Sequence, residues 1–107
     1  MRLTKTEVHS LIQAINPFIS NDAVELRLFG SRVKDHLKGG DIDLVLLSEH
    51  EVTATHLREN KHRILAAIKE LIGDQKIDIS IATFQDIAHE PFLKMILPES
   101  LLLKKWN

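Results

Sequence analysis

The stretch LFGSRVKDHLKGGDIDLVLL, residues 28–47, carries the strongest indications of fold and chemistry in this sequence. Gly30 and Ser31 end an alternating apolar segment, and Asp41 and Asp43 open a second segment of Ile, Leu and Val. Asp is uncommon in strands, because its short side chain competes for backbone hydrogen bonds. Strand periodicity places the two aspartates on one face, roughly 6.6 Å apart along the chain. Like charges so close together predict a shared divalent cation.

A third carboxylate, Asp78, lies in a later apolar segment, residues 76–82. If that segment forms a strand beside the one that Asp41 and Asp43 open, the three carboxylates meet on one face, as a two-metal phosphoryl-transfer centre requires. A Gly-Ser turn that enters a helix supplies backbone N–H groups and a hydroxyl for phosphate oxygens. Arg32, in the helix expected after this turn, is a further candidate phosphate contact.

Each of these features also has a purely structural interpretation. An Asp-x-Asp pair is common on solvated surfaces, and Asp78 alone would more often be an exposed charge on a sheet edge. A Gly-Ser pair is usually a turn, with Ser31 capping the helix that follows. It is their combination in one short sequence that favours a site.

The remaining pattern predicts an α/β (α+β) fold, a small mixed sheet packed with helices, in one domain over residues 1–107. Strands are expected over residues 24–28, 42–47 and 76–82, with a short final edge strand at 101–103. A capping box at Thr4 and Glu7 begins the first helix, which ends at Asn16-Pro17.

Three further helices are expected. One long helix closed by Gly73 is predicted by a single apolar stripe: Leu57, Ile64, Leu65, Ile68, Leu71 and Ile72. Thr83 caps a short helix, and Pro91 begins another that ends near Pro98. In that last helix, Phe92, Met95 and Ile96 are interpreted as a core stripe, with a protein interface as the alternative. Trp106 either folds back on the domain or packs on a partner.

Composition narrows the class of protein. The chain has 107 residues, 14 Lys and Arg, 15 Asp and Glu, and no Cys. The near-zero net charge disfavours a protein that coats nucleic acid, but it allows the binding of one nucleotide. Neither a signal peptide nor a membrane-spanning segment is expected, and a cytoplasmic location is predicted. The six histidines show no paired metal-ligand spacing, so they are interpreted as surface or interface residues.

The quoted stretch, followed by Asp78, resembles the signature of the minimal nucleotidyltransferases, small members of the DNA polymerase β-like superfamily. The resemblance extends over essentially the whole chain and implies the polymerase β-like palm fold. It implies that Gly30 and Ser31 hold a nucleoside triphosphate, with ATP as the donor, and that Asp41 and Asp43 bind both of two Mg²⁺ or Mn²⁺ ions. Asp78 would bind the catalytic ion and help to deprotonate the attacking hydroxyl.

Two residues depart from the pattern of this family. Many relatives carry Gly where this chain has Asp35, and Ser or Thr where it has Gly40. Asp35 places a negative charge within one helical turn of the expected triphosphate site, which would weaken nucleotide binding. Gly40 lacks a hydroxyl but leaves the three expected metal ligands intact.

The resemblance implies a function and a partner. Minimal nucleotidyltransferases often pair with a small helical HEPN protein in toxin–antitoxin modules, where they adenylylate a tyrosine of the toxin. An alternative is a catalytically silent antitoxin or scaffold that acts by covering its partner. A third possibility, transfer to an RNA 3′ end, is least favoured because no RNA-binding domain accompanies the near-neutral charge. Assembly into a homo- or hetero-oligomer remains open.

Overall fold

The computed structural model describes residues 3–30 and 41–107. Its strands are β1 (Val24–Phe29), β2 (Asp41–Ser48), β3 (Lys76–Thr83) and β4 (Leu101–Trp106). Its α-helices are α1 (Lys5–Ile15), α2 (Glu51–Glu59), α3 (Lys61–Ile72) and α4 (Pro91–Ile96). Short 3-10 helices follow α1, β3 and α4: η1 (Asn16–Phe18), η3 (Phe84–Ala88) and η4 (Leu97–Glu99). None of the helices in these ranges is long and apolar enough to cross a membrane.

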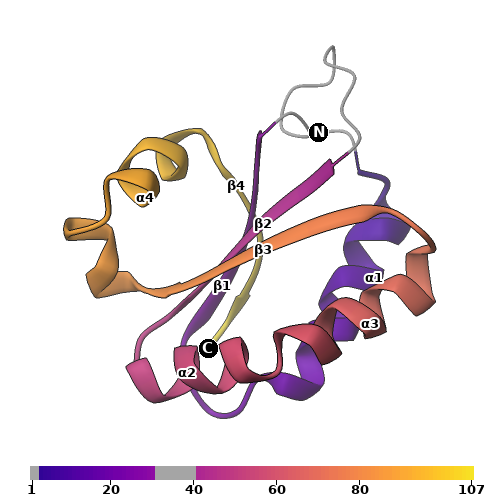
Figure 1. The fold of residues 1–107 in the computed structure, drawn as a ribbon, viewed down its shortest axis with the longest axis horizontal. Coiled ribbons are helices and arrows are strands. Elements are labelled where there is room, and N and C mark those ends of the chain that lie inside the picture. The colour runs from indigo at the N-terminus through magenta and orange to yellow at the C-terminus, as the bar shows by residue number, and fades with distance from the viewer. Residues whose placement is uncertain (1–2, 31–40) are drawn as a thin grey trace.

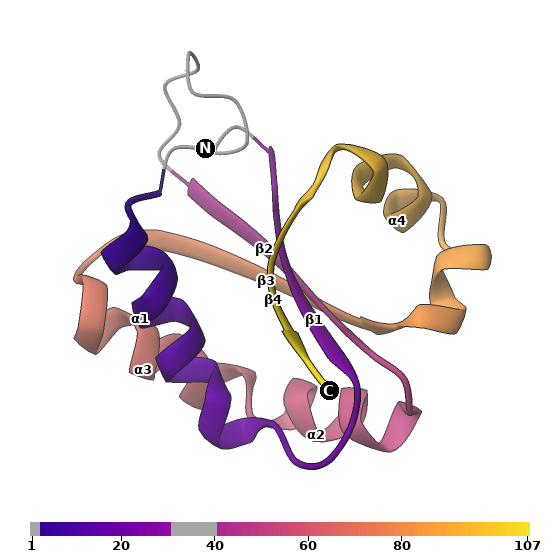
Figure 2. The same ribbon diagram turned by 180° about the vertical axis from the view of Figure 1, so that it is seen from behind.

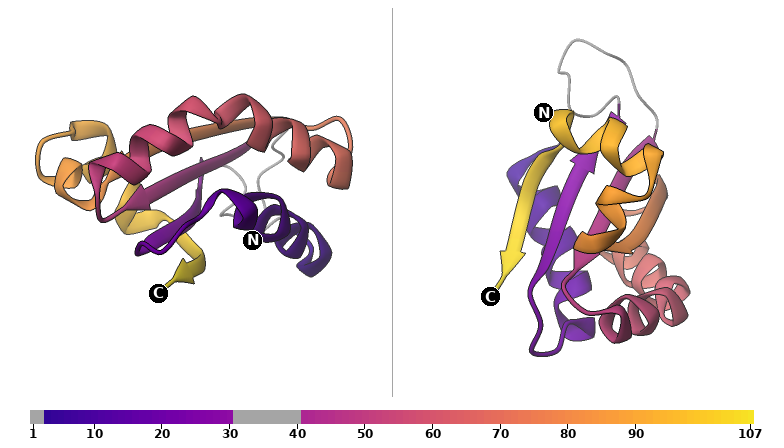
Figure 3. Two further views of the ribbon diagram at one scale, coloured as in Figure 1. Left: turned by 90° about the horizontal axis from the view of Figure 1, so that it is seen from below. Right: turned by 90° about the vertical axis from the view of Figure 1, so that its left-hand side faces the viewer.

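The four strands form one mixed sheet in the order β3-β2-β1-β4. β2 and β3 are parallel, and β1 is antiparallel to both β2 and β4. Parallel neighbours need a crossover connection, which α2 and α3 supply here. The right-hand view of Figure 3 shows β4, β1 and β2 side by side in this order. The predicted fold class, a small mixed sheet packed with helices, is confirmed.

Alternation along β2 divides the interior into two cores, one on each face of the sheet. Ile42, Leu44 and Leu46 are fully buried in the larger core, beneath α1, α2 and α3. Val45 and Leu47 point to the other face, where α4, η3 and η4 cover a smaller core. In Figure 1, α1 and α3 accordingly lie on one side of the sheet and α4 on the other. Figure 2 shows α1 and α3 next to each other from behind.

The prediction of one long helix before Gly73 is wrong, because the chain forms two helices that meet at Asn60. Asn60 leaves the helical region, with φ −106° and ψ 11°. Its side-chain amide donates to the His56 carbonyl oxygen at 2.9 Å, which ends α2 as α3 begins. The apolar stripe continues without a phase shift, since Leu57 and Ile64 both reach the larger core. The spacing of the apolar residues therefore gives no sign of the break between α2 and α3.

The C-terminus forms a longer strand than predicted and folds back on the domain. β4 pairs with β1 from the register of Leu101 to that of Trp106, whereas the sequence predicted a strand of residues 101–103 only. Trp106 packs against the larger core, and its Nε1 donates to Oδ1 of Asn16 at 2.9 Å. Of the two interpretations of Trp106, the structure therefore favours the folded-back one.

Candidate active site

Asp43 and Asp78 lie opposite each other across the parallel pair of β2 and β3, where they are Cα partners. Asp41 lies two positions before Asp43, so strand alternation puts its side chain on the same face. This face is opposite the larger core, because Ile42 and Leu44 are fully buried in that core. The sheet thus brings the three predicted carboxylates together where β2 and β3 begin.

Gly30 directly follows β1 and lies against the carboxylate of Asp43. Its φ is +83°, a conformation that favours glycine, and a Cβ atom on it would lie 2.6 Å from Oδ2 of Asp43. The last residue of β1, Phe29, is the register partner of Asp43, which explains the close approach. The Asp43 carboxylate therefore occupies the space that a side chain at residue 30 would need. That Gly30 holds a nucleotide remains a prediction.

The electrostatics of this cluster favour a bound cation. Burial raises the pKa of the Asp43 carboxyl above its ordinary value of 3.8, and the negative charges of Asp41 and Asp78 raise it further. Lys76 acts in the opposite direction, and its Nζ lies 3.8 Å from Oδ2 of Asp41. Ionised Asp43 is therefore costly in the protein alone, and a cation beside it would relieve this cost.

Several predicted contacts lie outside the described residues. These are Ser31 and Arg32, expected to contact the nucleotide, and the helix that was expected to follow Ser31. The two departures from the family pattern, Asp35 and Gly40, also belong to this range.

The sequence model of the nucleotidyltransferase domain matches residues 11–103, from within α1 to within β4. This chain belongs to the nucleotidyltransferase domain family. The predicted superfamily is thereby confirmed, while the minimal subtype and the partner remain predictions. A search of curated proteins and a search of solved structures found no match.

The donor set of this nucleotidyltransferase domain suits a hard divalent cation. Asp41, Asp43 and Asp78 present carboxylate oxygens on one face, and oxygen is the ligand that Mg²⁺ and Mn²⁺ prefer. The two aspartates of β2 are only partly exposed, whereas Asp78 is exposed. The absent side chain of Gly30 lets the Asp43 carboxylate lie directly against the end of β1. These residues therefore fit the cation site that the family resemblance implies.

An apolar wall borders the carboxylates of the nucleotidyltransferase domain. Phe29, next to Asp43 in the sheet, packs edge to face on Phe92 of α4, with ring centroids 5.7 Å apart and ring planes at 78°. Phe92 is nonetheless 44 % exposed, and Met95 is 68 % exposed. The interpretation of these two residues as core is wrong, because Leu93 occupies the inner face of this short helix and turns them outward.

A groove of about 450 Å³ lies between the sheet and the segment that contains α4 and η4. Arg27 and Lys94 are among its lining residues. Arg27 is held in place by Glu25, whose Oε1 accepts from Nε at 2.8 Å, and by Oγ of Ser100, which accepts from a guanidinium nitrogen at 3.2 Å. The groove lies on the same face of the sheet as the three carboxylates, since Arg27 and Phe29 are two positions apart on β1 and Phe29 is the register partner of Asp43.

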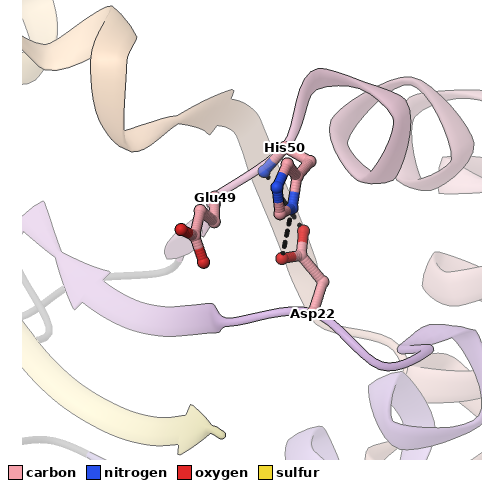
Figure 4. Close-up of side chains that lie close together, drawn as sticks. All are labelled: Asp22, Glu49 and His50. Carbon is pink, nitrogen blue, oxygen red and sulfur yellow. Dashed lines mark hydrogen bonds and ion pairs between the residues drawn. The ribbon is translucent and has the colours of Figure 1, made fainter.

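A second polar cluster, which sequence reasoning missed, lies at the other end of β2. Ligand atoms of Asp22, Glu49 and His50 lie within 4.8 Å of one another, a spacing that a metal ion could bridge. Asp41 and this cluster are at opposite ends of the strand, roughly 23 Å apart. Figure 4 shows two interactions between His50 and Asp22, and none that reaches Glu49. No sequence motif could have found this pair, because its members come from distant loops.

Hydrogen bonds within the protein satisfy the buried carboxylate of Asp22 in this second cluster. Asp22 accepts from Ala23 N at 2.8 Å and from His50 N at 3.2 Å, and its Oδ1 lies 2.9 Å from His50 Nδ1. Burial alone would raise the pKa of Asp22, but these bonds and one from Thr53 together hold it below 3.8. The same carboxylate raises the pKa of the His50 imidazole. The pair ties the start of β1 to the start of α2.

Proposed function

We propose that this chain is a minimal nucleotidyltransferase that transfers AMP from ATP to the tyrosine hydroxyl of a small helical HEPN protein. In this proposal the chain is the antitoxin of that protein and works in the cytoplasm. The observation that carries the proposal is the register of Asp43 opposite Asp78, with Asp41 on the same face. Membership of the nucleotidyltransferase domain family supports the reaction class.

The proposed step is an in-line transfer. The acceptor oxygen forms a bond to the α-phosphorus of ATP, the bond from that phosphorus to the bridging oxygen breaks, and pyrophosphate leaves. Asp78 would receive the hydroxyl proton. Asp41 and Asp43 would hold two Mg²⁺ or Mn²⁺ ions, and Asp78 would also bind the catalytic one. When bound, these ions supply the positive charge that neutralises the triphosphate and favours the ionised acceptor oxygen. Gly30, Ser31 and Arg32 would orient the triphosphate, as the resemblance implies.

A protein acceptor is supported by the surface next to the carboxylates. Phe92 and Met95 expose apolar area on α4, and Phe92 contacts Phe29 beside Asp43. A partner that docks there would hold its hydroxyl close to Asp78, which raises the effective concentration of a weak nucleophile. Exposed apolar side chains of this kind are typical of protein interfaces.

The same surface also supports a second candidate, an antitoxin that acts only by covering its partner. Binding through Phe92 and Met95 would need neither ATP nor the carboxylates. The two candidates differ in one property, because only the enzyme adds mass to its partner.

The experiment that tests the proposal is co-expression of the chain with the product of the neighbouring reading frame. The complex is purified through a tag on one protein, incubated with ATP and Mg²⁺, and the mass of the other is measured. Added AMP mass that is lost in Asp43→Ala supports the enzyme. Co-purification without added mass supports the binding-only antitoxin. Labelling of an RNA oligonucleotide, with no association between the two proteins, would replace both by transfer to an RNA 3′ end.

A further inference from the structure

Lys76 opens β3 in register with Asp41, which opens β2. Its Nζ lies 3.8 Å from Oδ2 of Asp41. Two positions further along both strands, Asp43 is paired with Asp78. The parallel register therefore brings one ammonium group together with three carboxylates. The aspartates were predicted from the sequence, but this lysine was not.

The Lys76 ammonium group lies beside a cluster of negative charges. Three carboxylates on one face repel one another, and Lys76 supplies the one ion pair to them that the described parts of the chain contain. Its influence extends to Asp43, whose pKa it lowers against the effects of burial and of the neighbouring carboxylates. Lys76 is itself 80 % exposed, so its side chain can swing away from Asp41 without disturbing the core.

We infer that Lys76 is a positioning residue that holds the Asp41 carboxylate while no divalent cation is bound, and releases it when the cation arrives with its nucleotide. This inference rests on the proposed function, because it takes Asp41 as a cation ligand. A free divalent cation must displace the ammonium group and is repelled by it. The triphosphate of ATP offsets that repulsion with its own negative charge. Lys76 thus biases the site against the free cation and toward the cation–nucleotide complex.

The test measures Mn²⁺ binding by calorimetry, without nucleotide and with a non-hydrolysable ATP analogue. Lys76→Gln is expected to tighten binding of Mn²⁺ alone by about fivefold, and to change it much less when the analogue is present. Lys76→Arg keeps the charge and should bind Mn²⁺ as the wild type does. Lys69→Gln is the matched control, because Lys69 is a similarly exposed lysine whose partner, Asp74, lies outside the site.

The possible outcomes distinguish failure of this inference from failure of the proposed function. Tighter Mn²⁺ binding in Lys76→Gln, with wild-type affinity in Lys76→Arg and Lys69→Gln, supports the positioning role. Equal or weaker binding in Lys76→Gln than in the wild type overturns the inference alone. Absence of Mn²⁺ binding in the wild type and in Lys76→Gln, with and without the analogue, overturns the proposed function and the inference with it.

Discussion

Gly30 and Asp43 approach so closely that a single added carbon would make them collide. A Cβ atom on Gly30 would lie 2.6 Å from Oδ2 of Asp43, a distance that real Cβ contacts do not show. The backbone at the end of β1 therefore fixes the position of the Asp43 carboxylate on β2. Residue 30 must stay without a side chain for Asp43 to keep its orientation.

Gly30→Ala should damage the site more than the fold. The positive φ costs about 1 to 2 kcal/mol for a residue with a Cβ, and the added methyl group must also displace the Asp43 carboxylate. Misplacement of a reacting group by about 1 Å commonly costs roughly a hundredfold in rate. We therefore expect nucleotidyl transfer and Mn²⁺ binding both to fall sharply, as measured by radiolabel transfer and calorimetry.

Gly73→Ala provides the control for this experiment. Gly73 has nearly the same φ, +84°, but nothing lies within 4 Å of a Cβ atom placed there. The Gly73→Ala variant should therefore be less stable than the wild type but retain nucleotidyl transfer. Equal loss of transfer in the two variants would show that backbone strain, and not the contact with Asp43, causes the effect.

Asp43→Asn should abolish transfer without destabilising the metal-free protein. Burial and the charges of Asp41 and Asp78 raise the pKa of Asp43 in the folded state, so its ionised form opposes folding above the unfolded pKa. That cost disappears as the pH falls through the folded pKa. At pH 7 and with a chelator present, we expect the variant to melt on the order of 2 °C above the wild type, and the gain should shrink toward pH 4.

Thermal unfolding followed by circular dichroism measures this difference, with Asp74→Asn as an exposed control. Asp74 is a carboxylate at the end of α3 whose partner is Lys69. A melting temperature of Asp43→Asn far below that of the wild type would mean that Asp43 supports the fold, and its assignment as a cation ligand would fail.

Nucleotide binding should require a divalent cation. A triphosphate and three carboxylates repel each other unless a cation bridges them. We expect ATP affinity to fall by about tenfold or more when a chelator removes Mg²⁺. Calorimetric titration of ATP with and without the chelator gives the comparison, and unchanged affinity would be incompatible with the proposed site.

The stability that His50 contributes should depend on pH. Its pKa is raised in the folded state by the hydrogen bond and the charge of Asp22, so this contribution is fully present below the unfolded pKa of about 6.5. It is lost as the pH rises through the folded pKa. His50→Ala should therefore lower the melting temperature more at pH 5.5 than at pH 8.5. His62→Ala, a change at an exposed position of α3, is the control for the loss of a histidine side chain.

The strands and the positions of the three carboxylates on them were largely predictable, because they follow from local sequence patterns. Alternation marks β1 and β3, and the apolar run after Asp41 and Asp43 marks β2. The capping box at Thr4 and Glu7 was also predicted and is present. Such signals depend on residues close together in the chain.

What could not be predicted depends on register and on distant partners. Nothing local says that Asp43 rather than Asp41 pairs with Asp78, and the same register decides that Lys76 reaches Asp41. The break at Asn60 escaped notice because the apolar stripe on its two sides stays in phase. One signal was available for Lys76: it precedes Asp78 by the same two positions that separate Asp41 from Asp43.

The parallel pairing of β2 with β3 has a consequence for the order of events during synthesis. The carboxylates of β2 leave the ribosome early, but Asp78 follows only after α2 and α3 have been made. Long-range parallel pairing forms slowly, because the entropy of the intervening segment is lost before the contacts between the strands stabilise the pair. A nascent chain that carries Asp41 and Asp43 alone lacks the third carboxylate and also Lys76. The three carboxylates are thus brought together in one late step, when β3 pairs with β2.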